Sequence, residues 1–527
     1  LKPYNIARTT STYDVDRLGE FMLSYKKEFG RHHFDALAGY TLQKKTYDRL
    51  GVEATGFADD RIHEVTAHGS EATDVQLYDT RKAGWAMMSF LTRVNYAFDD
   101  RYTLTASFRA DGSSRFGVDS RWGYFPSVSA GWTLSNEPFL KDALERVASI
   151  RLRASWGKSG NNDIGNYASI ASISTGSYAF GNTPVSTTYE GSFADAALGW
   201  ETTTQTNIGI DFGMFSGSLS VSADYYIKKT RDMLTIPPVL SVAGENAAMW
   251  MNTGDMDNHG FEVTVNYNSR RYGDFWLTGN FNISAYRNKL VKLNNFVTSV
   301  GGDYRLMIDQ PMGVYYGYVC DGIFQTPDQV SNHAIQQGAA PGRLIYRDID
   351  GNGVINEADR CIIGDPNPDF SLGLNLDFHY RDLTLSTFFT GDFGFDIYNT
   401  TKRQLYFMSN GGVSTNRSVD ILNAWTPTNT ATDIPALAMT DDNNETRMST
   451  YYVEDGSYFK MKYIKLAYAF PQKLLRPIGA SSLSVYGQLE NVFTITKYKG
   501  LDPEVFSGVD GNIYPRATTW SLGVVAN

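Results

Sequence analysis

Residues Arg101–Gly117 read RYTLTASFRADGSSRFG, and the first half of this stretch alternates strictly. Its even positions from Tyr102 to Phe108 are apolar or aromatic, while its odd positions carry Thr, Ser or Arg. Successive side chains of a β-strand point to opposite faces, so this segment presents one apolar and one polar face. The apolar face meets either a protein core, as in a soluble sandwich, or lipid, as in an outer-membrane barrel.

The same alternation recurs along most of the chain. The segments that carry it are residues 88–98, 207–212, 219–225, 261–267, 275–286, 372–380, 383–389, 457–470, 482–494 and 517–525. Asp99 and Asp100 alone separate the first of these from the strand after Arg101, which predicts a hairpin of minimum length. The pattern predicts roughly 15 to 16 strands of about 9 to 13 residues, the length that a tilted strand needs to cross a bilayer.

Composition excludes several classes of protein. No run of about 18 apolar residues occurs in the 527-residue chain, which excludes a membrane-spanning helix. The net charge of −10 argues against nucleic-acid binding. The two cysteines, Cys320 and Cys361, are too few for a disulfide framework, and we expect two free thiols.

The connections between the predicted strands are of two kinds. Short turns alternate with long polar segments, which we expect at residues 51–84, 161–200, 231–258, 289–369 and 392–455. A soluble sandwich has no reason to place every long loop at one end, whereas outer-membrane barrels have short periplasmic turns and long extracellular loops. Many aromatic residues also fall near the predicted strand ends, as an interfacial girdle requires.

No local motif supports an enzyme. Gly157–Ser159 resembles the end of a phosphate-binding loop but lacks its first glycine, and His63 and His68 are one residue too far apart for a zinc-protease helix. We therefore expect neither catalytic residues nor a catalytic cofactor.

One stretch does fit a metal-binding pattern. Residues 348–359 place oxygen donors in the order of a calcium-binding loop, with Gly353 at the position of the sharp turn. The predicted ligands are Asp348, Asp350, Asn352, the Val354 carbonyl, Asn356 and Asp359. Asp359 replaces the usual glutamate, and its shorter side chain closes the site less readily. The alternative is a solvated Asp/Asn/Gly turn.

The long loops contain candidate ligand-binding residues. Aromatic side chains among polar neighbours can stack on a sugar ring or fill a peptide pocket, although loop packing or placement in the aromatic girdle is the better explanation for any single one. The candidates for substrate binding are Tyr315, Tyr398, Tyr406, Asn416, Arg417 and Trp425.

Six stretches together resemble one family, the SusC/RagA-like TonB-dependent transporters of the bacterial outer membrane. They are residues 108–117 (FRADGSSRFG), 123–132 (GYFPS followed by GW), 198–202 (LGWET), 348–364, 452–460 (YVEDGSYFK) and 491–504 (NVFTITKYKGLDPE). They occur in family order and span almost the whole chain.

The resemblance implies a 22-stranded barrel around an N-terminal plug, preceded by a TonB-binding segment. Residues 1–527 look like the C-terminal part of such a barrel, holding the last 15 to 16 strands, with the plug and the TonB-binding segment outside this chain. The implied function is active import of a bulky nutrient across the outer membrane, an oligosaccharide first and a peptide second. The implied partners are a SusD-like surface lipoprotein that acts as a lid, and TonB.

Two other functions remain open from the sequence. A passive porin would share the barrel, and a soluble secreted glycan-binding protein or glycosidase would share the alternation, the calcium loop and the aromatic residues. The need for detergent separates the soluble alternative, because an exposed apolar strand face does not stay in water.

Overall fold

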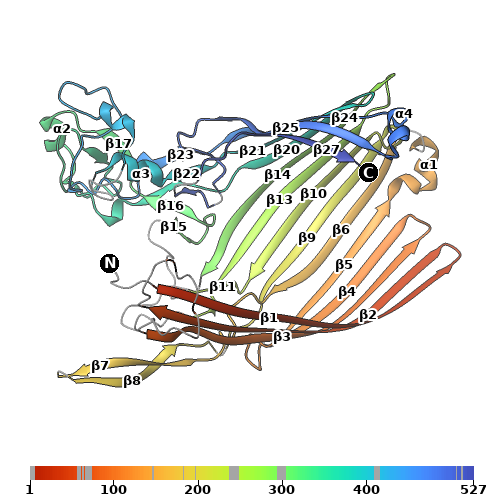
Figure 1. Ribbon diagram of the computed structural model, residues 1–527, viewed down its shortest axis with the longest axis horizontal. Helices are drawn as coiled ribbons and strands as arrows, with labels where there is room; N and C mark the ends of the chain where they lie inside the picture. The colour runs from red at the N-terminus through yellow and green to blue at the C-terminus, as the bar shows by residue number, and fades with distance from the viewer. Residues whose placement is uncertain are drawn as a thin grey trace. The chain divides into compact units, whose positions relative to one another are not determined.

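The computed structural model describes residues 6–55, 61, 65, 74–144, 148–181, 183–195, 197–236, 249–293, 304–408, 416–505, 507–511 and 514–526 (Figure 1). The chain divides into two compact units, one of residues 1–132, 154–206 and 229–255, the other of residues 133–153, 207–228 and 256–527. Across the described segments, every helix is too short or too polar to cross a membrane.

A large sheet dominates the described residues. It has 15 strands in the order β1-β2-β3-β4-β5-β6-β9-β10-β13-β14-β20-β21-β24-β25-β27. Their bounds are β1 Ile6–Phe29, β2 His32–Thr55, β3 Asp74–Phe98, β4 Tyr102–Ser113, β5 Trp122–Thr133, β6 Ala148–Asn161, β9 Glu201–Met214, β10 Leu219–Arg231, β13 Gly254–Asn268, β14 Phe275–Leu293, β20 Phe370–Tyr380, β21 Leu383–Phe393, β24 Tyr458–Ala469, β25 Leu483–Thr496 and β27 Thr519–Ala526. The order follows the chain, as in a meander, and agrees with the expected number of strands.

The alternation of β4 has the opposite sense to that of a soluble protein. Its apolar side chains are the exposed ones, with Tyr102 42%, Leu104 47% and Phe108 42% exposed. The polar side chains of the other face bond to one another, as in the 2.6 Å contact between the Ser107 and Ser127 hydroxyls. Among the residues that the structure describes, none forms a core over the apolar face of this strand, so the face is suited to lipid.

The predicted short turns are present. Asp99 and Asp100 both have positive φ, 54° and 51°, and together with Arg101 they form a three-residue turn between the paired Phe98 and Tyr102. Gly30 opens the turn between β1 and β2 with φ 62°, and Arg381 opens that between β20 and β21 with φ 52°. These tight connections fix the register of the strands that they join.

Charged side chains on the polar face of the second unit also bond to one another. The Arg153 guanidinium on β6 donates to Asp211 on β9 at 2.7 Å and to Asp224 on β10 at 2.9 Å. Gly209 leaves room for this contact, because a Cβ there would lie 2.3 Å from Asp224 Oδ1. A bidentate arginine shared between two carboxylates ties three strands together.

Two expectations were wrong: that the strands have about 9 to 13 residues, and that residues 51–84 form a loop. β1, β2 and β3 have 24, 24 and 25 residues, so much of the expected loop at residues 51–84 is strand. Cross-strand ion pairs such as Arg8 with Glu53 at 2.6 Å continue these strands beyond the apolar rows. Apolar alternation covers only part of each of these strands, because the strands continue where the apolar side chains stop.

The other long segments also contain regular structure. Residues 161–200 include the hairpin of β7 Ser172–Phe180 and β8 Thr183–Ser192. The shorter strands are β11 Leu234–Thr235, β12 Met251–Asn252, β15 Tyr304–Arg305, β16 Val314–Gly317, β17 Cys320–Ile323, β18 Leu344–Tyr346, β19 Cys361–Gly364, β22 Asp396–Asn399, β23 Val453–Asp455 and β26 Val509–Asp510. The helices are α1 Pro138–Leu144, α2 Pro327–Ser331, α3 Thr400–Tyr406 and α4 Gln472–Leu475, with single 3₁₀ turns at 134–136, 215–217, 357–359, 419–423, 450–452 and 476–478.

The described parts of residues 304–369, 395–457 and 497–511 pack into one body, which we call the loop domain. Its elements α2, α3, β16, β17, β22 and β23 gather together in Figure 1. Its core is a cluster of buried aromatic and aliphatic side chains that includes Tyr315, Tyr346, Tyr398 and Tyr452. Two long loops and the last one before β27 therefore fold with a hydrophobic core of their own.

Candidate functional site

The tyrosines of the loop domain are held by hydrogen bonds as well as by packing. The Tyr315 hydroxyl donates to the Asp396 carbonyl at 3.0 Å and to the Gly508 carbonyl at 2.5 Å. The Tyr452 hydroxyl donates to the Glu445 carbonyl at 2.7 Å, and its ring meets that of Tyr398 edge-on at 5.8 Å. Buried phenols need such partners, so these side chains join separate segments of the domain.

Three of the six residues predicted to bind substrate lie in this core. Tyr315, Tyr398 and Trp425 are 0%, 1% and 8% exposed. The rings of Tyr315 and Tyr398 lie 6.2 Å apart, and Trp425 donates its indole N–H to Gln325 Oε1 at 2.8 Å. In this structure the three side chains pack the loop domain, and contact with a ligand stays a prediction for them.

The other three lie near α3. The Tyr406 hydroxyl donates to the Asp420 carboxylate at 2.8 Å, and burial together with that carboxylate raises the pKa of Tyr406. The Arg417 guanidinium donates to the carbonyls of Gln404 and Met408, which fastens the following segment to the helix. Asn416 is exposed. Substrate binding by these residues likewise stays a prediction.

The predicted calcium loop brings its acidic residues together. One carboxylate oxygen from each of Asp348, Asp350 and Asp359 lies within 4.8 Å of the others. The Gly353 amide donates to Asp348 at 2.8 Å, and this bond outweighs burial and holds the pKa of Asp348 below its usual value. Three ionised carboxylates at this spacing repel one another unless a cation lies between them.

The two ends of this loop are fixed to the rest of the loop domain. Asp359 and Asn356 form a reciprocal capping box at the 3₁₀ turn of residues 357–359. The Ile355 amide donates to the Ile335 carbonyl at 2.9 Å, and the Tyr318 hydroxyl donates to Glu357 at 3.2 Å. Residues 348–359 are thus preformed as a turn with the oxygen donors in calcium-loop order.

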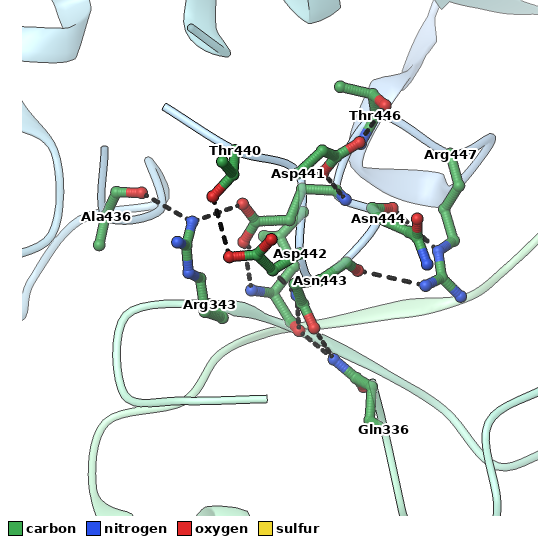
Figure 2. A network of polar contacts seen from close by, with 12 residues as sticks. Gln336, Arg343, Ala436, Thr440, Asp441, Asp442, Asn443, Asn444, Thr446 and Arg447 are labelled. Carbon is green, nitrogen blue, oxygen red and sulfur yellow. Dashed lines mark hydrogen bonds and ion pairs between the residues drawn. The ribbon is translucent and has the colours of Figure 1, made fainter. Parts of the chain in front are cut away.

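A network of polar contacts joins residues 441–447 to Gln336 and Arg343 (Figure 2). Gln336 donates to Asn443 Oδ1 at 2.7 Å, and Arg343 donates to Glu445 Oε2 at 2.9 Å. Glu445 is 2% exposed, and burial raises its pKa. The Leu344 amide at 3.1 Å and the Asn443 side-chain amide at 3.5 Å also donate to the Glu445 carboxylate, so the network is well satisfied and stiffens this side of the domain.

A cavity of about 720 Å³ opens beside the loop domain within the second unit. Its walls combine Tyr286 of β14 and Asp392 of β21 with residues of the loops, chiefly Pro366, Phe395, Glu504 and Arg516. The Tyr458 hydroxyl donates to Asp392 at 2.6 Å. The volume and the mixture of apolar and polar groups are those of a small-molecule or oligomer subsite.

A cluster of charges holds one wall of this cavity. The Lys460 ammonium lies 2.9 Å from Asp502 and 2.8 Å from Glu504, and its side chain is 3% exposed. Lys462 and Arg516 also pair with Glu504, Arg516 at 3.1 Å. Burial opposes ionisation of Glu504, but Lys460 and Lys462 outweigh it and lower the pKa of Glu504.

The sequence reasoning did not single out the lining of this cavity. Tyr286, Asp392 and Arg516 are far apart in the sequence and meet only in the fold. Lys460 and Glu504 could have been selected from the sequence, because each is the last residue of a stretch that resembles the SusC/RagA-like family, YVEDGSYFK and KGLDPE. The cysteines are as expected: Cys320 and Cys361 are free thiols.

Comparison with known proteins agrees with this architecture. The family model described as TonB dependent receptor-like, beta-barrel matches residues 3–318. The chain belongs to this family. Its members lie in the outer membrane and act as receptors and transporters, which confirms the predicted barrel fold, the outer-membrane location and the absence of enzymatic function.

Curated relatives and solved structures confirm the resemblance to SusC and RagA. TonB-dependent receptor P3 of Formosa agariphila is 32% identical over 99% of this chain and 52% of its own length. TonB-dependent receptor SusC of Bacteroides thetaiotaomicron is 30% identical over 95% of this chain and 49% of its own. A structure of the RagAB peptide transporter superposes with a TM-score of 0.85 at 25% identity, over 99% of this chain and 56% of that one. The chain spans about half the length of the curated relatives that it matches.

Proposed function

We propose that this chain forms the C-terminal part of the barrel of a transporter that imports a bulky nutrient across the outer membrane by a TonB-dependent mechanism. The observation that carries the proposal is the cavity of about 720 Å³. The cavity is lined by side chains of β14 and β21 of the large sheet and by side chains of the loops, so a ligand in it contacts both at once. A ligand that contacts both the strands and the loop domain binds best to one arrangement of these parts, so ligand binding shifts the protein toward that arrangement.

The proposed substrate is an oligosaccharide. A carbohydrate needs hydrogen-bond donors and acceptors that converge on its hydroxyls, and apolar surface beside them. Asp392, Asn367 and Arg516 supply the donors and acceptors in the cavity, and Phe395 and Pro366 supply the apolar surface. The relative of known structure is described as a peptide transporter, so a peptide is the other outcome that the experiment must distinguish.

The proposed partners follow from the same relatives. A SusD-like lipoprotein would cover the loop domain as a lid, and TonB would act through an N-terminal plug outside this chain. Closure of a lid over bound substrate excludes water and commits the substrate to transport.

The test uses the full-length protein purified in detergent from outer membranes. Native mass spectrometry identifies retained ligands and bound lipoproteins, and uptake of the identified ligand is then measured in cells with and without a protonophore. We expect an oligosaccharide, a lipoprotein and uptake that stops with the protonophore. Uptake unaffected by the protonophore would indicate a passive porin, and a protein that is stable without detergent would refute the barrel.

An Asp392→Asn variant tests the role of the cavity in the same cells. The change removes a charge while keeping the volume, and it should reduce uptake by about tenfold through weaker hydrogen bonds to the substrate. Asp382→Asn, in the turn between β20 and β21, is the matched control and should leave uptake unchanged. Equal uptake by both variants would place the substrate elsewhere.

We also propose that residues 348–359 bind Ca²⁺. The support is the cluster of three carboxylates together with Asn352, Asn356 and the Val354 carbonyl in calcium-loop order, because Ca²⁺ prefers six to eight oxygen ligands. The ion would stiffen this part of the loop domain. Limited proteolysis in Ca²⁺ and in chelator tests the proposal.

We expect Ca²⁺ to protect residues 344–364 from cleavage in the native protein and not in the Asp348→Ala/Asp350→Ala variant. The barrel should stay folded in that variant. Asp328→Ala, in α2 of the same domain, is the control and should behave as the native protein. Equal cleavage of the native protein in Ca²⁺ and in chelator would exclude the site.

A further inference from the structure

The exposed face of β1, β2 and β3 changes character along its length. Phe21, Tyr40 and Phe90 lie opposite one another in one row of the sheet, and Phe21 and Phe90 are 69% and 50% exposed. The next row holds Leu42 and Met88 and continues through Gly112 of β4 to Trp122 of β5. Both rows are apolar and aromatic, as the lipid face of an outer-membrane protein requires.

The row after these two is basic. Arg17 and Lys44 are direct cross-strand partners on this same face, and both are exposed. Within the described segments, no carboxylate lies at ion-pair distance from either. Asp48 is the carboxylate in the following rows of this face, and it pairs with Lys82 at 3.8 Å. Two like charges directly opposite each other destabilise a sheet unless an anion lies between them.

The position of this pair along the strands coincides with a membrane boundary. Phe29 ends β1 at the tight turns, where Phe98, Tyr102 and Trp132 stack in sequence at ring distances of 6.4 Å. Arg17 precedes Phe29 by 12 residues, which at about 3.4 Å each is roughly 41 Å along the strand. With a tilt of about 40° this is a height of about 31 Å, a few ångströms more than the apolar band of about 25 Å of an outer-membrane barrel, which places the pair at the level of the headgroups.

A groove lies beside the basic pair. Its volume is about 520 Å³, and its lining includes Lys44, Lys82 and the Asp48 carboxylate that lies 3.8 Å from Lys82, together with Tyr13, Ser114 and Tyr167. Lys44 is therefore the cation of this lining that has no carboxylate beside it among the described residues. Cations, hydroxyl donors and aromatic rings at the edge of an apolar face suit a group that is anionic at the surface and joined to acyl chains below.

We propose that Arg17 and Lys44 bind the phosphates of a lipid headgroup in the outer leaflet, with Lys82 as a further contact. The lipid's acyl chains would lie on the rows of Phe21, Phe90 and Trp122. The two cations relieve their mutual repulsion by sharing the anion, and the apolar rows anchor the same molecule from below. The site is distinct from the nutrient cavity and does not depend on which nutrient is carried.

The test measures lipid bound to the full-length protein in nanodiscs of phosphatidylcholine that contain diphosphoryl lipid A, monophosphoryl lipid A or neither. Native mass spectrometry after release from the nanodisc gives the occupancy. Each removed charge should weaken binding of diphosphoryl lipid A about fivefold, so Arg17→Gln/Lys44→Gln should weaken it about 25-fold. Monophosphoryl lipid A should bind less tightly than the diphosphoryl form.

Lys45→Gln is the matched control. Lys45 neighbours Lys44 on β2 but points to the opposite face, where it pairs with Asp14 at 3.1 Å. This variant should bind lipid as the native protein does, and Arg17→Lys should restore most of the binding lost in Arg17→Gln. Equal occupancy in native and double-variant protein would overturn the proposal. Displacement of lipid A by millimolar inorganic phosphate or by dextran sulfate would also overturn it, in favour of a soluble anion.

Discussion

Replacement of Lys460 by methionine should open the segment of residues 497–511 without unfolding the sheet. Methionine keeps most of the volume, so the change removes the charge that neutralises Asp502 and Glu504. Breaking a buried ion pair by removing one partner costs about 3 to 5 kcal/mol. Lys462 and Arg516 still reach Glu504, so we expect a cost at the lower end, about 3 kcal/mol.

Amide hydrogen exchange of the full-length protein in detergent measures this cost locally. A loss of about 3 kcal/mol corresponds to exchange that is faster by roughly 100-fold in this segment, with the strands of the sheet unchanged. Lys462→Met is the control: its side chain is 23% exposed and contacts Glu504 alone among the carboxylates of the cluster, so exchange should accelerate by about fivefold at most.

The same segment should loosen in acid. The pKa of Glu504 is lower in the folded protein than in the unfolded chain, so its contribution to stability is full above the unfolded value, about 4.3. The contribution is lost as the pH falls from there through the folded value. If Lys460→Met leaves exchange in residues 497–511 as slow as in the native protein, the cluster does not hold this wall of the cavity.

Two further predictions concern single side chains. Gly209→Ala places a Cβ 2.8 Å from Arg153 Nη2 and should cost about 1 to 3 kcal/mol, seen as a lower temperature for loss of the folded band in heat-modified electrophoresis. Gly487→Ala is the control, because the nearest neighbour of its Cβ would be 3.4 Å away, and it should change this temperature little. Equal decreases in the two variants would show that crowding at Gly209 is not the cause. Burial raises the pKa of Cys320 to about 11, so iodoacetamide at pH 8 should label Cys361 before Cys320. Labelling of Cys320 should accelerate as the pH rises. Labelling of Cys320 before Cys361 at pH 8 would contradict the burial of Cys320.

The wall of the sheet was predictable because its signal is local. Lipid contact selects apolar side chains at every second residue, so β4 and its neighbours are recognisable one strand at a time. The halves of β1 to β3 that lie away from the tight turns lack this signal, since both of their faces carry polar groups, such as Arg49 and Asp79 on one face and Asp48 and Lys82 on the other. Pairing with neighbouring strands, which a single segment does not reveal, maintains them as strands.

The candidate sites differ in the same way. The calcium loop could be proposed from the sequence because all six predicted ligands fall within 12 residues and their spacing is that of a single turn; calcium binding there stays a prediction. The cavity was not, since Tyr286, Asp392 and Arg516 are separated by more than one hundred residues and meet through the order of the strands. Burial also separates two kinds of tyrosine that look alike in the sequence: Tyr315 packs the loop domain, while Tyr286 lines the cavity.

The hairpin of β7 and β8 is a suitable place to attach a label. In the described structure these strands pair with each other as a two-stranded sheet of their own, and Ser177 and Ser186 face each other with exposed side chains. A fluorophore or affinity tag attached at Ser177 therefore alters neither the wall strands nor the cavity. A labelled hairpin would allow single molecules of the protein to be counted and followed on living cells, and would show directly whether they gather where the proposed nutrient is supplied.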